Sequence, residues 1–310
     1  MVTWNLAQAS PSAADCAFLL EDHSDAAVLV VGAQEVEDLK PRRSEGRRSR
    51  HLKRVLLASL GPVFEPVVMT SLGAIHLCVF VRKDVVRHLN RRSLLTWDVA
   101  CGVGNVLQNK GALGVRLQVA GLRLLFLSGH LAAHQARIKD RNADYERIMR
   151  ESELVLGGSF RGLDCIFFGG DLNYRLDLNR EEVELAIPDS TPSETSETSD
   201  GIAELQGRLR SLLDQDQLSR VRASGEAFDG FAEGGISFPP TFKFDRHSDD
   251  YDTSKKRRVP AWTDRILYRA LRTSVDLVSY GSVSSSRHSD HRPVSGKFRV
   301  KNPTALTPTN

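Results

Sequence analysis

The chain has 310 residues, of which 41% are hydrophobic and 26% charged, and a formal net charge of +3. This length allows a sizeable core in one large or two ordinary domains. No apolar run is long enough to span a bilayer, and the first residues, MVTWNLAQ, lack the pattern of a secretory signal. We therefore expect a soluble, cytoplasmic protein, and the small positive excess does not by itself indicate a polyanionic partner.

The apolar runs in the chain indicate an α/β protein. Strand-like runs cover 26–35, 73–81, 112–130, 163–171, 274–283 and 294–300. Several of these runs are continuous rather than alternating, which is typical of strands covered on both faces. Residues 136–156 and 202–213 carry apolar residues at helical spacing, and the acidic, Ser/Thr-rich residues 188–201 have the composition of a mobile loop. The mixture predicts a layered domain.

Basic residues are concentrated in two segments. Residues 40–54 read KPRRSEGRRSRHLKR, and residues 255–258 read KKRR. We expect the first segment to be a solvated surface or a mobile loop, with contact to an anionic membrane surface as the alternative.

The four cysteines form no C-x-x-C pair and mostly lie in apolar surroundings. They are Cys16, Cys78, Cys101 and Cys165. We expect reduced thiols, mostly in the core, without a metal or disulfide role.

Polar residues stand at the ends of three apolar runs and just before the last one. These residues are Glu35, His130, Asp171, Asn173, Asp290 and His291. Any one of them could cap a turn, but ligands in open α/β sheets bind beyond strand ends, so the set together indicates a site.

Several familiar catalytic patterns are absent from the sequence. It contains no G-x-S-x-G, no G-x-x-x-x-G-K-[ST], and no cysteine followed six positions later by arginine. The HLAAH stretch at 130–134 superficially suggests a zinc pair, but leucine stands where the H-E-x-x-H motif needs its glutamate.

What remains is an oxygen-rich set with two histidines: Asn5, Glu35, Asp171, Asn173, Asp264 and Asp290, with His130 and His291. Carboxylate and amide oxygens suit Mg²⁺, which commonly shares its ligands with phosphate oxygens. The set predicts hydrolysis of a phosphate ester by an activated water.

The motifs also resemble one family from end to end. TWN, GAQEVE, NKGALGVRL, SGHLAAHQARIKDRNADYERI, FFGGDLNYRL, FPPTFKFD, RRVPAWTDRIL and SDHRPV occur in this order between residues 3 and 294. They look like the successive motifs of the inositol polyphosphate 5-phosphatases, within the wider metal-dependent endonuclease/exonuclease/phosphatase superfamily. The resemblance implies one catalytic domain over residues 1–300, followed by a tail at 301–310. Its fold would be a four-layer sandwich of two packed mixed β-sheets flanked by helices.

The resemblance also implies roles for the candidate residues. Glu35 would be the main Mg²⁺ ligand, with Asn5 and Asp290 close to the metal. Asp171 would orient and deprotonate the attacking water, and Asn173 would position that water or a phosphate oxygen. His291, oriented by Asp264, and His130 would contact the scissile phosphate from two sides.

Substrate selection would come from cations. By resemblance, Lys243, Lys256 and Arg258 would clamp a 4-phosphate beside the scissile 5-phosphate, and Asn109 and Lys110 would also bind the substrate. The family often has tyrosine where Phe242 stands. The implied substrate is a phosphoinositide such as phosphatidylinositol 4,5-bisphosphate, or a soluble inositol polyphosphate.

The expected protein is a monomer that acts peripherally at the cytosolic face of an anionic membrane and binds no nucleic acid. One alternative is a Mg²⁺-dependent nuclease of the same superfamily, whose binding would weaken steeply with salt. Another is a catalytically weak module that only binds phosphoinositides.

Overall fold

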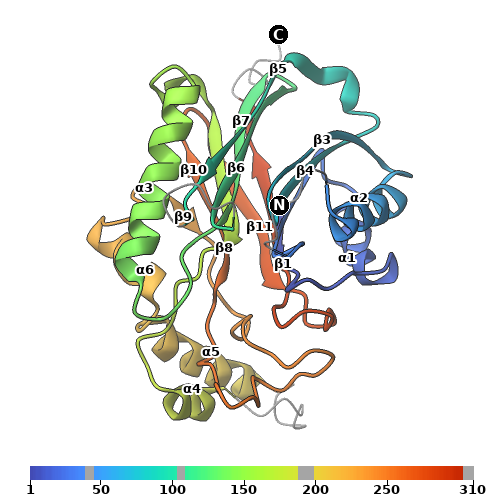
Figure 1. Ribbon diagram of the computed structural model, residues 1–310. Helices are drawn as coiled ribbons and strands as arrows, with labels where there is room; N and C mark the ends of the chain where they lie inside the picture. The colour runs from blue at the N-terminus through green and yellow to red at the C-terminus, as the bar shows by residue number, and fades with distance from the viewer. Residues whose placement is uncertain (39–44, 103–108, 188–198, 303–310) are drawn as a thin grey trace.

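Two six-stranded mixed sheets pack face to face in the computed structural model, which describes residues 1–38, 45–102, 109–187 and 199–302 (Figure 1). The first sheet has the order β11-β12-β1-β2-β4-β3 and the second β5-β6-β7-β8-β10-β9. Each sheet contains one parallel pair, β1 with β2 and β7 with β8, whereas its other pairs are antiparallel.

The first sheet consists of β1 (Val2–Asn5), β2 (Val28–Gln34), β3 (Phe64–Leu72), β4 (Ile75–Arg82), β11 (Val275–Ser282) and β12 (Val294–Val300). The second consists of β5 (Leu89–Ala100), β6 (Gly111–Val119), β7 (Leu122–His130), β8 (Cys165–Asp171), β9 (Ala232–Glu233) and β10 (Asp264–Ala270). The helices are α1 (Phe18–Glu21), α2 (Arg47–Leu60), α3 (Ile138–Val155), α4 (Arg180–Ala186), α5 (Ser199–Leu213) and α6 (Gln217–Ser224).

Helices cover the outer faces of both sheets. In Figure 1, α1 and α2 lie against the first sheet, α3 and α6 against the second, and α4 and α5 together beyond one end. The predicted four-layer sandwich is therefore confirmed. Among the described residues, none of these helices has the length and apolar character needed to cross a membrane.

Central strands such as β4 and β8 bury both of their faces. In β4, Leu77 and Val79 point into the core between the sheets, whereas Cys78 and Phe80 pack under α1 and α2. In β8, Phe167 joins the central core, and its neighbours on the other face pack with α3 and α6. Because successive side chains of a strand alternate between faces, two apolar environments require the continuous apolar runs seen in the sequence.

The elements missing from the prediction are mostly short or lie at sheet edges. The run at 112–130 is a hairpin of β6 and β7, while β1, β3, β5, β9 and β10 were not predicted. Both β3 and β5 are edge strands, and half of the residues of β5, LNRRSLLTWDVA, are polar, in keeping with the partial exposure of this strand.

For residues 40–54 we expected a solvated surface or a mobile loop, and the mobile loop is wrong over 47–54, whereas residues 40–44 lie outside the described residues. Residues 47–54 are the first part of α2, with Leu52 and Leu56 on its buried face. Arg48 pairs with Asp38 at 3.4 Å, and Arg47, Arg50 and Arg54 are exposed, as expected for a solvated surface. The apolar spacing of this helix was obscured by its density of arginine.

The acidic stretch at 188–201 lies largely outside the described residues. Its last part is helical, because α5 begins at Ser199, earlier than the predicted 202. The expectation of mostly buried thiols without a disulfide is confirmed: all four cysteines are free, Cys16, Cys78 and Cys165 are buried, and burial raises the pKa of each of these three thiols to about 12.

A buried ion cluster joins α6, β9 and β10. The Arg265 side chain is fully buried; its Nε and Nη2 atoms donate to the two Glu233 oxygens at 2.6 and 2.8 Å. Its Nη1 atom donates to both oxygens of Asp216 at 3.1 and 3.0 Å. Arg222 pairs with Glu233 at 3.1 Å, and the hydroxyl of Tyr280 donates to the same carboxylate at 3.0 Å. The cluster fixes the strand that begins with Asp264.

Candidate active site

A cleft opens where strand ends of both sheets meet. In the parallel pairs, Asn5 is in register with Gln34, and His130 with Asp171. The cleft has a volume of about 230 Å³. Its lining includes Glu35, Lys110, Asp171, Asn173, Arg175, Phe242, Lys243, Lys256, Arg258 and His291. The structure therefore brings most of the predicted site residues to one place.

Asp171 lies at the centre of this set. Its carboxylate is 2% exposed and accepts hydrogen bonds from Asn5 Nδ2 at 2.8 Å and from its neighbour Asn173 N at 3.1 Å. His130 Nε2 lies 3.3 Å from the same carboxylate. Burial acts to raise the pKa of Asp171, but the His130 hydrogen bond and the nearby cations outweigh burial and hold this pKa well below its usual range. Asp171 is therefore an anion at neutral pH.

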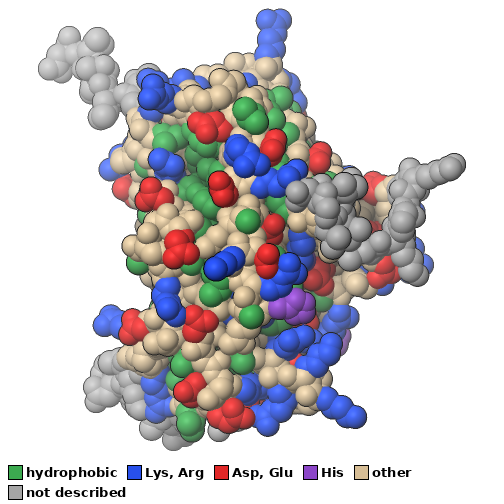
Figure 2. All heavy atoms as spheres, turned by 60° about the vertical axis from the view of Figure 1, so that its left-hand side comes forward, with side chains coloured by type: hydrophobic (Ala, Val, Ile, Leu, Met, Phe, Trp, Pro, Cys, Tyr) green, Lys and Arg blue, Asp and Glu red, His purple; other side chains and the backbone are tan. Residues whose placement is uncertain are grey.

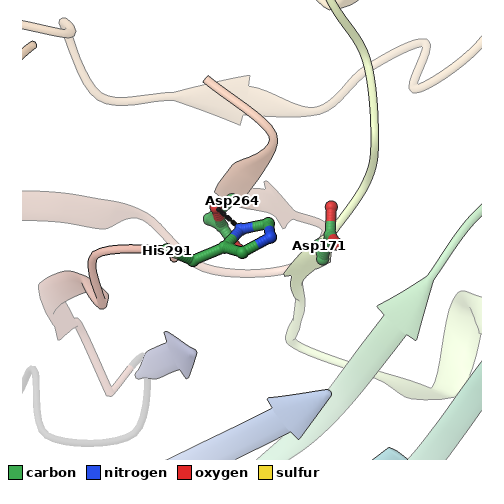
Figure 3. Close-up of side chains that lie close together, drawn as sticks. All are labelled: Asp171, Asp264 and His291. Atoms are coloured by element: carbon green, nitrogen blue, oxygen red, sulfur yellow. Dashed lines mark hydrogen bonds and ion pairs between the residues drawn. The ribbon is translucent and has the colours of Figure 1, made fainter. Parts of the chain in front are cut away.

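His291 and Asp264 form a buried pair opposite Asp171 (Figure 3). His291 Nδ1 lies 2.8 Å from Asp264 Oδ2, which also accepts hydrogen bonds from the Thr241 and Thr263 hydroxyls, both at 2.9 Å. Figure 3 shows the other ring nitrogen of His291 pointing toward Asp171. Burial lowers the pKa of His291, but the charge of Asp264 outweighs it and raises this pKa to about 9. The ring is thus a cation that presents Nε2–H to the cleft.

Potential ligand atoms of Asp171, Asp264 and His291 lie within 4.8 Å of one another. Since Asp264 Oδ2 already accepts donors from two threonines and His291, we interpret Asp264 and His291 as a hydrogen-bonded pair beside Asp171 rather than as part of a metal centre.

Glu35 has the features expected of a ligand for a hard cation. It follows β2 with a positive φ of 52°, and its side chain lines the cleft with 43% exposure. Among the described residues its one ionic contact is with His130, at 3.7 Å. An accessible carboxylate beside the Asp171 anion fits Mg²⁺, which prefers oxygen ligands and retains several waters.

The other two predicted metal residues have partners of their own. The Asn5 amide donates to Asp171 and accepts from Ala7 N at 2.9 Å, so Asn5 also orients the carboxylate. Asp290 lies 3.5 Å from Lys243 Nζ and 3.9 Å from His291 Nε2. The structure thus places both residues beside the cleft, although neither lines it.

Cations surround the remaining space. Lys110 contacts His130, and burial lowers the pKa of Lys110 to about 8. Lys243 lies on one side, and Lys256 and Arg258 are exposed at the cleft mouth. Asn109 precedes Lys110 without lining the cleft. Figure 2 shows Lys and Arg side chains gathered around exposed histidine on one side of the molecule.

Arg175 is a cleft residue that was not among the predicted site residues. Its guanidinium donates to the Asn173 backbone oxygen at 3.2 Å and to Asn173 Oδ1 at 2.5 Å, and it lies 4.2 Å from the centroid of the Phe242 ring. The described residues give it no carboxylate partner within ion-pair distance, and burial lowers the pKa of Arg175 to about 10. The signal in the sequence was the spacing D-x-N-x-R, which places this cation beside the catalytic candidates.

The zinc alternative is not supported by the arrangement of its histidines. His130 ends β7, whereas His134 lies in the following loop with a φ of 77°. The two side chains therefore do not form the helical pair that the H-E-x-x-H motif requires.

Residues 2–297 match the model of Endonuclease/Exonuclease/phosphatase family 2, and the chain belongs to this family. Within it, the resemblance to inositol polyphosphate 5-phosphatases is confirmed. The structure of the inositol polyphosphate 5-phosphatase domain of SPsynaptojanin, in complex with inositol (1,4)-bisphosphate and a calcium ion, is similar with a TM-score of 0.77 and 30% identity. The similarity covers 96% of this chain and 82% of that domain.

Full-length relatives show the same similarity over part of their length. Synaptojanin of Caenorhabditis elegans is 34% identical over 290 residues, which are 91% of this chain and 24% of that protein. Human synaptojanin-1 is 37% identical over 221 residues, covering 71% of this chain and 12% of that protein. The chain thus spans a quarter or less of the length of these relatives.

Proposed function

We propose that the chain is a Mg²⁺-dependent phosphatase that removes the 5-phosphate from phosphoinositides such as phosphatidylinositol 4,5-bisphosphate, from soluble inositol polyphosphates, or from both. The observation that carries this proposal is the pairing of an anionic Asp171 with a cationic His291 across a small cleft rimmed by lysine and arginine. A bound phosphate would meet cations on several sides and a buried carboxylate from within.

The protein groups divide the work as follows. Asp171 accepts the proton of the attacking water, and its hydrogen bond from Asn5 keeps the carboxylate oriented. His291 donates from Nε2 to the scissile phosphate, while Asp264 holds Nδ1. Asn173 and Arg175 form one hydrogen-bonded unit that positions the water or a phosphate oxygen, and His130 contacts the same phosphate.

The metal would be held mainly by Glu35, with Asn5 and Asp290 nearby. When bound, Mg²⁺ supplies positive charge to the phosphate oxygens and lowers the pKa of a coordinated water.

Lys243, Lys256 and Arg258 would bind a phosphate next to the scissile one, with Asn109 and Lys110 as further substrate contacts. Lys243, Lys256 and Arg258 line the cleft, as does Lys110. Asn109 and Lys110 directly precede β6. We further propose that the domain acts as a monomer at the cytosolic face of an anionic membrane, where basic side chains at the mouth of the cleft favour the surface.

The test is phosphate release, with and without Mg²⁺, from a panel of phosphoinositides in vesicles and soluble inositol phosphates, with an abasic DNA duplex alongside. Release confined to substrates that carry a 5-phosphate is the expected result, and the panel ranks lipid against soluble forms. Cleavage of the DNA with an inert inositol panel would support the nuclease instead. Tight binding without release would support the binding module.

A further inference from the structure

The segment 251–260, YDTSKKRRVP, which we call the basic strap, separates two cavities. Lys256 and Arg258 face the catalytic cleft. The other side of the basic strap lines a larger cavity of about 970 Å³, where Arg257 is joined by Arg180 and Glu184 of α4. The basic strap is therefore a wall whose front carries the proposed substrate-binding cations.

No described residue makes a hydrogen bond or ion pair with the side-chain nitrogens of Lys256 or Arg258. Both side chains are exposed. Their reach into the cleft therefore depends on where the backbone of the basic strap is held, because the backbone fixes the base of each side chain. That backbone has no regular secondary structure beyond one bridge residue, Tyr251.

Several contacts hold this backbone: the Asp252 amide donates to the Lys243 carbonyl at 2.8 Å, and the Thr253 amide donates to the Asp245 carboxylate at 3.2 Å. Two further groups tie Arg258 itself. From within the basic strap, the Asp252 carboxylate accepts from Arg258 N at 2.9 Å and from Ser254 N at 3.2 Å. From outside, Arg180 donates through Nη1 to the Arg258 carbonyl at 2.6 Å and the Asp252 carbonyl at 3.4 Å. Its Nη2 atom donates to the Tyr251 carbonyl at 3.3 Å. The amide and carbonyl of Arg258 are thus both tied, one to each group.

Glu184 completes the connection to α4. One of its oxygens lies 2.7 Å from Arg180 Nη2, and the other lies 3.0 Å from Arg257 Nη2. Arg180 is 8% exposed and is the first residue of α4, whose start is fixed by a capping box between Asn179 and Glu182. The planar guanidinium of Arg180 donates to three backbone carbonyls, and a lysine ammonium at this position would lose part of this geometry.

We propose that Arg180, anchored by Glu184, is a positioning residue that fixes the basic strap and so sets the preference for substrates with a phosphate next to the scissile one. This inference rests on the proposed function. The inference goes beyond that function because it assigns selectivity to a residue of α4 that lies behind the cleft wall and does not face the substrate.

The experiment compares two soluble inositol phosphates that both carry a 5-phosphate, only one of which also carries a 4-phosphate. For Arg180→Met we expect KM for the 4-phosphorylated substrate to rise at least about tenfold with kcat changed less than about twofold. KM for the other substrate should change less than about twofold. For Arg180→Lys, KM for the 4-phosphorylated substrate should lie between the values of the unmodified protein and of Arg180→Met. The matched control is Arg150→Met, at an exposed arginine of α3, which should leave both KM values unchanged.

Glu184→Gln provides a second test if Arg180→Met does not fold. It should raise the same KM by about threefold, whereas Glu181→Gln, on the same helix, should leave it unchanged. In a Lys256→Ala, Arg258→Ala background, neither Arg180→Met nor Glu184→Gln should alter the ratio between the substrates any further, because both act through these cations.

A parallel loss on both substrates would overturn the inference and leave Arg180 with a structural role only. An unchanged ratio in both Arg180→Met and Glu184→Gln would overturn it as well. If the unmodified protein releases phosphate from neither substrate, it is the proposed function that fails, a result distinct from either of these.

Discussion

Removal of the Arg265 charge should expose how much of the stability depends on the buried ion cluster. Arg265→Met keeps most of the apolar volume of the side chain but leaves Asp216 and Glu233 facing each other with Arg222 as their remaining cation. Removing one partner of a buried ion pair costs about 3–5 kcal/mol, since the remaining charge stays buried without compensation. We expect a loss of about 4 kcal/mol in the free energy of unfolding, or about 6 °C in Tm.

The assay is urea denaturation of Arg265→Met, Glu233→Gln and the double variant. Glu233→Gln should cost less, about 1–3 kcal/mol, because Arg265 keeps Asp216 as a partner. The double variant restores the charge balance, so it should be more stable than Arg265→Met alone. A loss below about 1 kcal/mol for Arg265→Met, or a double variant whose loss equals the sum of the two, would refute this account of the cluster.

Three further predictions concern catalysis, selectivity and pH. Asp171→Asn should lower kcat at least about a thousandfold in a phosphate-release assay with little change in Tm; a near-normal rate would remove Asp171 from the mechanism. Lys256→Ala with Arg258→Ala should reduce the preference for a 4-phosphorylated substrate at least about tenfold without altering the Mg²⁺ titration, and an unchanged substrate panel would contradict the clamp. Burial lowers the pKa of His76 to about 4. The unfolded chain therefore binds a proton below pH 6.5 that the folded protein does not, and stability should fall by about 3 kcal/mol between pH 6.5 and 4. His76→Gln should flatten that fall in a series of urea titrations, and an equal slope would exclude His76 as its source.

The central strands of the core were predictable because their burial on both faces is reflected in consecutive apolar residues. The run VLVVGAQ of β2 is apolar at consecutive positions up to its final glutamine, which is typical of a strand covered on both faces, and β4 and β8 share this character. By contrast, β1 has four residues, too few for any periodicity, and its identity depends on pairing with β2 and β12. The apolar spacing of α2 was hard to recognise among its basic residues, and β5 was hard to recognise as a strand because of its polar residues.

The site was predictable in its members more than in its connections. Strand ends indicated Glu35, His130 and Asp171, but nothing local indicates that Asn5 donates to a carboxylate 166 positions away. The role of Arg180 is of the same kind, since its partners are backbone carbonyls more than 70 positions further along the chain. Such contacts follow from the packing of whole elements, which no short window of sequence contains.

Two short contacts at the cleft join the two sheets. Asn5 ends a strand of the first sheet and Asp171 one of the second, and their 2.8 Å hydrogen bond crosses between them. The 2.8 Å contact of His291 with Asp264 crosses in the same way, because His291 leads into β12 while Asp264 begins β10. How the two sheets sit against each other is determined by close-packed side chains such as Val79 and Phe167.

A change of volume at those core positions would slide one sheet against the other and alter both crossing contacts at once. Turnover should consequently respond to substitutions that lie far from any group that meets the substrate. If the proposed activity is established, the interior between the sheets is therefore a place to adjust its rate by directed evolution while every candidate catalytic side chain remains unchanged.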